Sequence, residues 1–228
     1  DLHKNMENYF NAKKILFDNM KKGSKAISNK DDIYGEKIVS SQSLDKIFYS
    51  INKPSDYQAT NIHIGLEGLE FNLCYDRKQY RMKSKLIGRF NVYNILASIA
   101  SAINLGISME TLQKSLLDFE PVNGRFNAEK LNNGAFAVID YSHTSDSLKN
   151  AIFTAKEIIS SANKGRVITI FGCGGNKDKT KRPVMGKIAS EYSDYAIVTS
   201  DNPRYEDPMD IINQILSGMG GKKNYIVE

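Results

Sequence analysis

The sequence predicts an α/β protein of two domains, divided after residue 121. Residues 1–121 combine helical spacing of apolar side chains with a run of alternating apolar and polar residues, which indicates helices and antiparallel strands. Residues 122–228 alternate strand-like and helix-like segments, which predicts a mostly parallel sheet covered by helices. A turn-forming segment at 121–124 separates the two patterns.

The first helix and the first strands are predicted from local spacing. Residues 4–22 carry apolar side chains at helical intervals, and Gly23 follows as a residue type that commonly ends helices. Short strands are expected at 25–28 and 37–40, on either side of a turn at 31–32.

Residues 60–90 follow a period of two residues. This alternation, interrupted by turn residues such as Gly68, predicts an antiparallel meander with one face on a core. Two helices are expected after the meander, at 91–105 and 109–118, the second capped by Ser108.

The second domain repeats the order strand, helix. Strands are expected at 136–141, 166–171, 195–199 and 225–227, and helices at 147–160, 183–192 and 208–216. In such folds ligands bind at the carboxyl ends of the strands. Three segments rich in polar residues, 140–144, 172–182 and 200–204, follow the first three strands. We therefore expect them to meet at one edge of one sheet and to form a binding site there.

Composition and charge exclude several classes of function. A content of 41% hydrophobic and 25% charged residues is that of a globular chain rather than a disordered one. The net charge of +5 fits an anionic partner, and the scattered Lys and Arg residues favour a small anion such as a nucleotide over nucleic acid. No apolar run reaches the roughly 18 to 20 residues that cross a bilayer. Cys74 and Cys173 lie far apart in the sequence and fit a reducing compartment such as the cytoplasm, with a single disulfide as the alternative. We also expect a monomer without membrane insertion.

The segment 172–182 has features of an anion-binding loop. Gly172, Gly174 and Gly175 permit positive φ and close approach of backbone N–H groups to an anion, although their spacing fits neither common nucleotide-binding glycine pattern. Arg182 precedes Pro183 and is expected at a helix N-terminus, where the dipole and the guanidinium both attract a carboxylate. An isolated loop of this kind is also consistent with an ordinary strand-to-helix connection.

Lys13 interrupts the apolar stripe of the first predicted helix. It lies midway between Met6 and Met20, so a straight helix places it among apolar neighbours. One interpretation is a lysine whose amine extends past the stripe to water. The other is a desolvated amine that reacts with CO2 and binds Mg²⁺ as a carbamate, with His3 reaching the same ion.

Six segments, in the same order along the chain, resemble the motifs of the Mur ligases. They are 1–13, 26–32, 88–94, 124–125, 140–144 and 171–186. The resemblance covers nearly the whole chain. It implies that residues 1–121 are the C-terminal part of a central ATPase domain, and that residues 122–228 are a Rossmann-like C-terminal domain that binds an amino acid.

The resemblance also implies roles for single residues. Lys13 matches a carbamylated lysine that helps to hold Mg²⁺, and His3 matches a histidine of the same metal site. Lys13 and His143 are the catalytic residues that we expect. The residues expected to bind ATP are Asn91, Asn94, Arg125 and Asp140.

Residues Asp201, Asn202, Pro203 and Arg204 match the segment with which this family selects the incoming amino acid. In the family, Asp-Asn-Pro-Arg goes with enzymes that add meso-diaminopimelate, whereas L-lysine-adding relatives usually lack the arginine. The chemistry agrees, because meso-diaminopimelate carries a distal carboxylate that L-lysine lacks. Arg204 is suited to bind this carboxylate through two hydrogen bonds, and Arg182 is expected to hold a second carboxylate.

The implied reaction joins meso-diaminopimelate to UDP-MurNAc-L-Ala-D-Glu through an acyl phosphate made from ATP with Mg²⁺, in bacterial peptidoglycan synthesis. The chain departs mildly from the family at Ser142, Ser145 and 176–177. It contains no G-x-x-G-K-[ST] segment and does not begin with Met, so we expect a fragment that is inactive alone. Two alternatives stay open: an L-lysine-adding or other Mur-type ligase, and a non-catalytic binding module derived from one.

Overall fold

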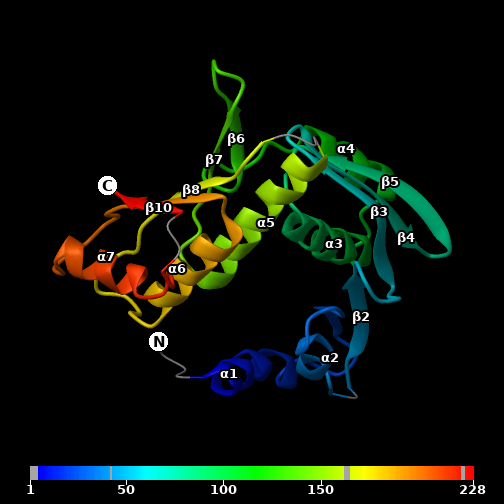
Figure 1. Cartoon of the computed structure of the whole chain (residues 1–228). Coiled ribbons are helices and arrows are strands. Elements are labelled where there is room, and N and C mark those ends of the chain that lie inside the picture. The colour runs from blue at the N-terminus through cyan, green and yellow to red at the C-terminus, as the bar shows by residue number, and fades with distance from the viewer. Residues whose placement is uncertain (1–4, 42, 162–164, 222–223) are drawn as a thin grey trace. The chain divides into compact units, whose positions relative to one another are not determined.

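A computed structural model describes residues 5–41, 43–161, 165–221 and 224–228, and the chain divides into two compact units, Asp1–Pro121 and Val122–Glu228 (Figure 1). Within the first unit, the helices are α1 (Met6–Asp18), α2 (Gly35–Ile38), α3 (Arg89–Asn104) and α4 (Met109–Asp118). Its strands are β1 (Lys25–Asn29), β2 (Asp45–Ser50), β3 (Tyr57–Gly65), β4 (Gly68–Tyr75) and β5 (Lys78–Ser84).

The five strands of the first unit form one sheet in the order β1-β2-β3-β4-β5. The predicted meander is confirmed, since β3, β4 and β5 pair antiparallel. The strands β1, β2 and β3 pair parallel, and α3 packs against all three of them. Ser108 caps α4 as predicted, because its Oγ accepts a hydrogen bond of 3.2 Å from the amide of Thr111.

The prediction of a strand at 37–40 is wrong. Part of that segment lies in α2, which provides the connection between the parallel strands β1 and β2. Gly35 lets α2 lie directly against β1, because a Cβ at this position would lie 1.7 Å from the carbonyl oxygen of Asn29. Val39 is fully buried in a small cluster with Ala26 and Leu44. Apolar spacing alone did not distinguish a short buried helix from a strand here.

The second unit holds a three-stranded parallel sheet in the order β10-β9-β8, with helices packed around it (Figure 1). Its helices are α5 (Ser145–Ser161), α6 (Lys181–Tyr192) and α7 (Pro208–Leu216), and its strands are β6 (Asn127–Lys130), β7 (Phe136–Ile139), β8 (Ile168–Phe171), β9 (Tyr195–Val198) and β10 (Tyr225–Val227). The core lies between α5, α6, α7 and this sheet, and it includes fully buried Ala196, Val198 and Ile215.

One topological expectation needs correction. Strand β7 does not lie in the parallel sheet; it pairs antiparallel with β6 to form a separate two-stranded sheet. The strand β6 was not predicted, because residues 127–130 are mostly polar and show little alternation. The segment after β7 therefore does not end at the same sheet edge as the segments after β8 and β9.

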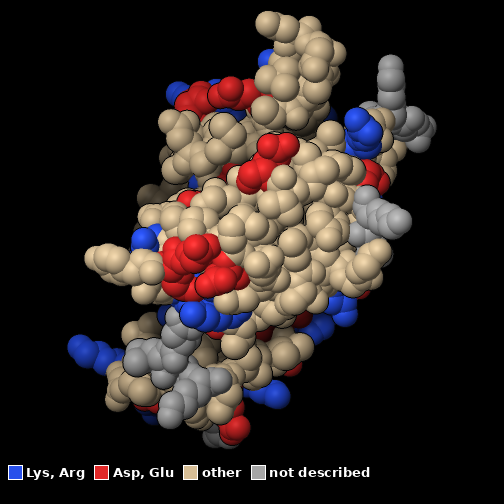
Figure 2. Space-filling model, turned by 60° about the vertical axis from the view of Figure 1, so that its left-hand side comes forward, with Lys and Arg blue, Asp and Glu red and all other residues tan. Residues whose placement is uncertain are grey.

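The described helices include none that is both long and apolar enough to span a membrane. On the face shown in Figure 2, Lys and Arg atoms lie in small separate groups between wide areas of uncharged residues. Cys74 and Cys173 are both free thiols.

Candidate functional site

Two loops of the second unit meet beyond the ends of β8 and β9. Phe171 and Val198 are paired at the carboxyl ends of these strands, so the chain leaves the sheet twice at the same place. We call residues 172–178 the glycine loop and residues 200–206 the selector loop. Both were predicted from sequence to lie at this edge, and the structure brings them together.

Hydrogen bonds donated by backbone amides connect the two loops directly. The amide of Gly175 donates to the carbonyl oxygen of Asn202 at 2.8 Å, and the amide of Tyr205 donates to Oδ1 of Asn176 at 3.1 Å. Contact is so close at Gly175 that a Cβ there would lie 1.9 Å from the carbonyl oxygen of Pro203. The glycine is therefore required for the close approach of two backbones. It was predicted instead to allow the close approach of an anion.

Arg182 lies at the helix N-terminus where it was predicted, in the first turn of α6. It was also expected to hold a substrate carboxylate, yet its side chain is fully buried. Both terminal nitrogens donate to the carboxylate of Glu206 at 2.9 Å, one also donates to Gln214 Oε1 at 2.9 Å, and the other to the carbonyl of Gly174 at 3.3 Å. All four terminal N–H groups thus have protein acceptors, and only Nε is without a partner among the described residues.

Glu206 was not predicted as a site residue. Its carboxylate accepts from Arg182, from the amide of Asn176 at 2.6 Å, and from Lys179 Nζ at 3.1 Å. These bonds, led by that to Arg182, hold the pKa of the Glu206 carboxyl well below its usual range. The sequence carried no motif for this pair, because the two residues are 24 positions apart and only the folded loops bring them together.

Arg204 is the other arginine that was predicted to bind a substrate carboxylate, and it is exposed whereas Arg182 is buried. The Arg204 backbone has a φ of +52°, in the left-handed region that an L-residue adopts at a cost, and its Nη1 donates to the carbonyl oxygen of Gly175. No carboxylate within the described ranges forms an ion pair with it. Of the other selector residues, Asp201 and Asn202 are exposed and Pro203 is half-buried. The loop therefore presents one exposed guanidinium without a bound counter-charge.

The segment 140–144 reaches the start of α6 by a single described contact. Lys181 Nζ donates to the carbonyl oxygen of His143 at 2.6 Å, and the His143 ring is exposed beside Tyr141, with ring centroids 5.2 Å apart. Asp140 accepts from the amide of Phe126 at 2.9 Å and from the Ser142 hydroxyl. Arg125 is exposed and lies over the Tyr141 ring, 5.4 Å from its centroid. His143 and Arg125 are thus accessible, while the Asp140 carboxylate is already hydrogen-bonded to Phe126 and Ser142.

The two predicted ATP-binding asparagines lie on α3 of the first unit. Asn91 is buried; its Nδ2 donates to the carbonyl oxygen of Ile87 at 2.9 Å, and its Oδ1 accepts from Asn94 Nδ2 at 3.0 Å. Asn94 is exposed. Asn91 therefore makes its side-chain hydrogen bonds to Ile87 and Asn94, which leaves Asn94 as the accessible member of the pair.

A second polar cluster, near α3, brings together Asp31 and Tyr93 from two of the motif segments, 26–32 and 88–94, although no role was predicted for either residue. Asp31 Oδ2 accepts from the amides of Ile51 at 2.7 Å and Asn52 at 3.0 Å, and from the Tyr93 hydroxyl at 2.9 Å. Burial, with the bond to Asp31 added, raises the pKa of Tyr93 to about 12. This cluster connects the turn after β1 to α3 and to the residues after β2.

The predicted metal site is not assembled within the described residues. His3 lies outside them, and Lys13 is exposed on α1, with its Nζ 5.5 Å from the centroid of the Tyr9 ring. Lys13 was placed by spacing in an apolar stripe, but α1 has no buried residue at all, so its apolar side chains do not surround the amine. The described part of the chain holds no group of three or more His, Cys, Asp or Glu suited to a metal ion.

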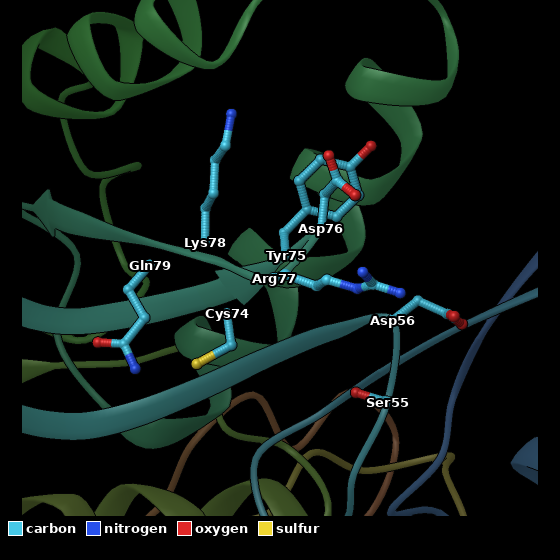
Figure 3. Close-up of a pocket in the computed structure, with 8 residues that line it drawn as sticks. All are labelled: Ser55, Asp56, Cys74, Tyr75, Asp76, Arg77, Lys78 and Gln79. Carbon is cyan, nitrogen blue, oxygen red and sulfur yellow. The ribbon is translucent and has the colours of Figure 1, made fainter.

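An open pocket lies elsewhere, in the first unit at the turn between β4 and β5 (Figure 3). Cys74 and Gln79 face one part of it, and the Arg77 side chain extends toward Asp56. None of the predicted site residues lines it, and Asp56 already accepts from the amide of Phe48 at 2.7 Å. This pocket therefore does not form part of the predicted site.

Comparison with known families and proteins agrees with this architecture. The Mur ligase middle domain matches residues 1–102, and the Mur ligase glutamate ligase domain matches residues 124–228. The chain is 42% identical, over its whole length, to a UDP-N-acetylmuramoyl-L-alanyl-D-glutamate–2,6-diaminopimelate ligase of Clostridium botulinum, of which it covers 46%.

Solved structures of similar proteins share the fold of this chain. The structure of a UDP-N-acetylmuramoyl-L-alanyl-D-glutamate–2,6-diaminopimelate ligase is 29% identical with a TM-score of 0.61, and the match covers 99% of this chain and 47% of that one. The MurF structure from Acinetobacter baumannii reaches a TM-score of 0.78 at 17% identity, again over 99% and 47%, and shows the shared fold alone.

The matches cover only part of the length of each relative. The chain spans about half the length of the curated relatives that it matches. The two family domains fall one in each compact unit and together leave few residues unmatched. The chain belongs to the Mur ligase family.

Proposed function

We propose that the protein containing this chain is an ATP-dependent ligase that adds meso-diaminopimelate to UDP-MurNAc-L-Ala-D-Glu in the bacterial cytoplasm. The observation that carries the proposal is Arg204, an exposed guanidinium on a loop held in place by backbone contacts, without a carboxylate partner among the described residues. A planar guanidinium binds a carboxylate through two parallel hydrogen bonds. The distal carboxylate of meso-diaminopimelate is the group that L-lysine cannot offer.

The names of the similar proteins support the same substrate. Several relatives at about 40% identity are named as 2,6-diaminopimelate ligases, including proteins of Syntrophomonas wolfei and Synechocystis. The Asp-Asn-Pro-Arg segment is intact here at 201–204. We assign amino-acid selection to Arg204 and no longer to Arg182, because the terminal N–H groups of Arg182 are already used by protein acceptors.

In the proposed reaction, an oxygen of the D-Glu γ-carboxylate attacks the γ-phosphorus of ATP and ADP leaves, which gives an acyl phosphate. The amine of the diamino acid then attacks the acyl carbon, the bond from that carbon to the phosphate oxygen breaks, and the nitrogen loses a proton to solvent. Asn94 and Arg125 are the accessible candidates for ATP contacts, and His143 for a catalytic contact. The described residues do not assemble a Mg²⁺ site, so no step is assigned to the ion here.

Phosphate release by the full-length protein tests the proposal. With ATP and UDP-MurNAc-L-Ala-D-Glu present, we expect release to be fast with meso-diaminopimelate and slow with L-lysine. Replacing Arg204 by Ala removes a charge-assisted contact of about 1.5 to 3 kcal/mol, so the preference should fall by roughly 10-fold to 100-fold. Lys187→Ala, which removes an exposed cation on α6, is the matched control and should keep the preference. Equal rates with the two amino acids in the unmodified protein would contradict the proposal.

A further inference from the structure

We propose that Glu206 is a positioning residue of the amino-acid site: through buried Arg182 and the Asn176 amide, it fixes the glycine loop against the selector loop and so sets the direction of Arg204. This inference rests on the proposed function, because it concerns how the same site is held in shape.

The Glu206 carboxylate accepts four hydrogen bonds from protein groups. Oε1 accepts from the Asn176 amide at 2.6 Å and from Arg182 at 2.9 Å, and Oε2 accepts from Arg182 at 2.9 Å and from Lys179 at 3.1 Å. Two acceptor positions on each oxygen account for the capacity of a carboxylate. Glu206 therefore has no acceptor position left for the ammonium group of a substrate, which favours a positioning role over direct binding.

The guanidinium that Glu206 contacts is held rigidly. Arg182 is fully buried in α6, where its Nη1 also bonds to Gln214 of α7. A buried guanidinium with several fixed acceptors has little freedom to turn. Glu206 thus connects the selector loop to two helices of the core, and its removal would leave a buried positive charge without its counter-charge.

Glu206 is also connected to Arg204 through the backbone of the selector loop. The Glu206 amide donates to the carbonyl oxygen of Pro203 at 3.0 Å, which closes the turn containing Arg204. Each loop contains one non-glycine residue in the left-handed region, Asn176 with φ +53° and Arg204 with φ +52°. Such backbone persists where surrounding contacts hold it, and Glu206 provides one of them on each loop. Arg204 in turn donates to the carbonyl oxygen of Gly175.

The test compares Glu206→Gln with the unmodified full-length protein by two measurements. The first is the KM for each substrate. We expect the KM for meso-diaminopimelate to rise roughly tenfold, because a misdirected Arg204 loses most of a charge-assisted contact, while the KM for ATP changes less than about twofold. General damage to the fold would instead lower the active fraction and hence kcat.

The second measurement is amide hydrogen exchange, which does not depend on activity. Peptides from 171–178 and 200–206 should lose protection in Glu206→Gln, while peptides from 57–84 in the first unit should keep it. If the unmodified protein does not use meso-diaminopimelate, the proposed function fails, and the exchange result still decides whether Glu206 holds the loops together.

A double variant, Arg182→Met with Glu206→Leu, covers the case in which Glu206→Gln does not fold. Apolar residues of similar size commonly replace a buried ion pair without loss of stability. The double variant should fold and still show the raised KM and the faster exchange. An unchanged KM in either variant, or a raised KM with unchanged exchange in the two loops, would overturn the positioning role.

Discussion

Helices α1 and α6 each carry a cation for which the sequence predicted a functional role. One of these cations is more exposed to water than predicted, and the other is more deeply buried. Lys13 was placed by helical spacing among apolar neighbours, and it is exposed on a helix with no buried residue. Arg182 was expected to hold a substrate carboxylate at a helix N-terminus; it does lie in the first turn of α6, but it is fully buried and ion-paired with Glu206. Spacing determines the angle of a side chain around its helix. The segments that pack on that face determine whether the side chain meets water, an acid or a substrate.

The comparison predicts unequal costs of removing the two cations, with Arg182→Met the larger. Loss of this side chain leaves Glu206 without its main partner and leaves Gln214 and Gly174 without their donor. We expect the second unit to lose about 3 kcal/mol of unfolding free energy. Urea titration of the full-length protein, followed through exchange protection of residues 165–221, measures it. A loss below about 0.5 kcal/mol would show that the ion pair contributes little.

Gly175→Ala should have the next largest effect, because it acts on the contact between the loops rather than on the ion pair. The new Cβ would lie 1.9 Å from the Pro203 carbonyl oxygen, so one backbone must move. We expect a loss of about 2 kcal/mol, as for an overpacked core site. Gly65→Ala is the control, since its Cβ would have no atom nearer than 4.0 Å. Equal melting temperatures for the two variants would contradict the close approach.

The stability of the second unit should also depend on pH through Glu206. Its folded pKa lies below the unfolded value of about 4.3, so its contribution is present above that value and is lost as the pH falls through the folded pKa. The unfolding midpoint of the second unit should therefore decrease from about pH 5 downward. Glu206→Gln should make this decrease shallower. Parallel pH profiles for the two proteins would show that another acid is responsible.

Lys13→Ala should have the smallest effect on stability, within about 0.5 kcal/mol, because the side chain is exposed. Its effect on activity is a separate question. If Lys13 is the carbamylated ligand of Mg²⁺ that the sequence predicts, the full-length variant should be inactive and small carboxylates should restore part of the activity. Full activity without any addition would show that Lys13 only contacts solvent and the Tyr9 ring.

The sequence predicted most of the elements and the edge at which the two loops meet. Periodicity was sufficient for the meander of β3, β4 and β5, and the regular order of strands and helices was sufficient for β8, α6 and β9. It failed for α2, where a short apolar segment fits either class of element, and for the pairing of β7 with β6. Both failures concern which segments pack together, and local spacing does not contain that information.

Local sequence patterns were also insufficient to predict every residue of the site. Arg204 was predicted from a motif of consecutive residues, and the structure leaves it accessible. Glu206 stands two positions further along and had no motif of its own. Its partners Asn176, Lys179 and Arg182 come from another loop and helix, so its role became visible only through the hydrogen bonds of the folded unit.

A structure of the full-length protein with meso-diaminopimelate bound would test the central claim most directly. The claim is that exposed Arg204 binds the distal carboxylate while buried Arg182 remains paired with Glu206. We predict two hydrogen bonds from the Arg204 guanidinium to that carboxylate, at about 2.7 to 2.9 Å, with the contacts between Arg182 and Glu206 unchanged. A substrate carboxylate that displaces Glu206 from Arg182, with Arg204 turned away, would contradict the account.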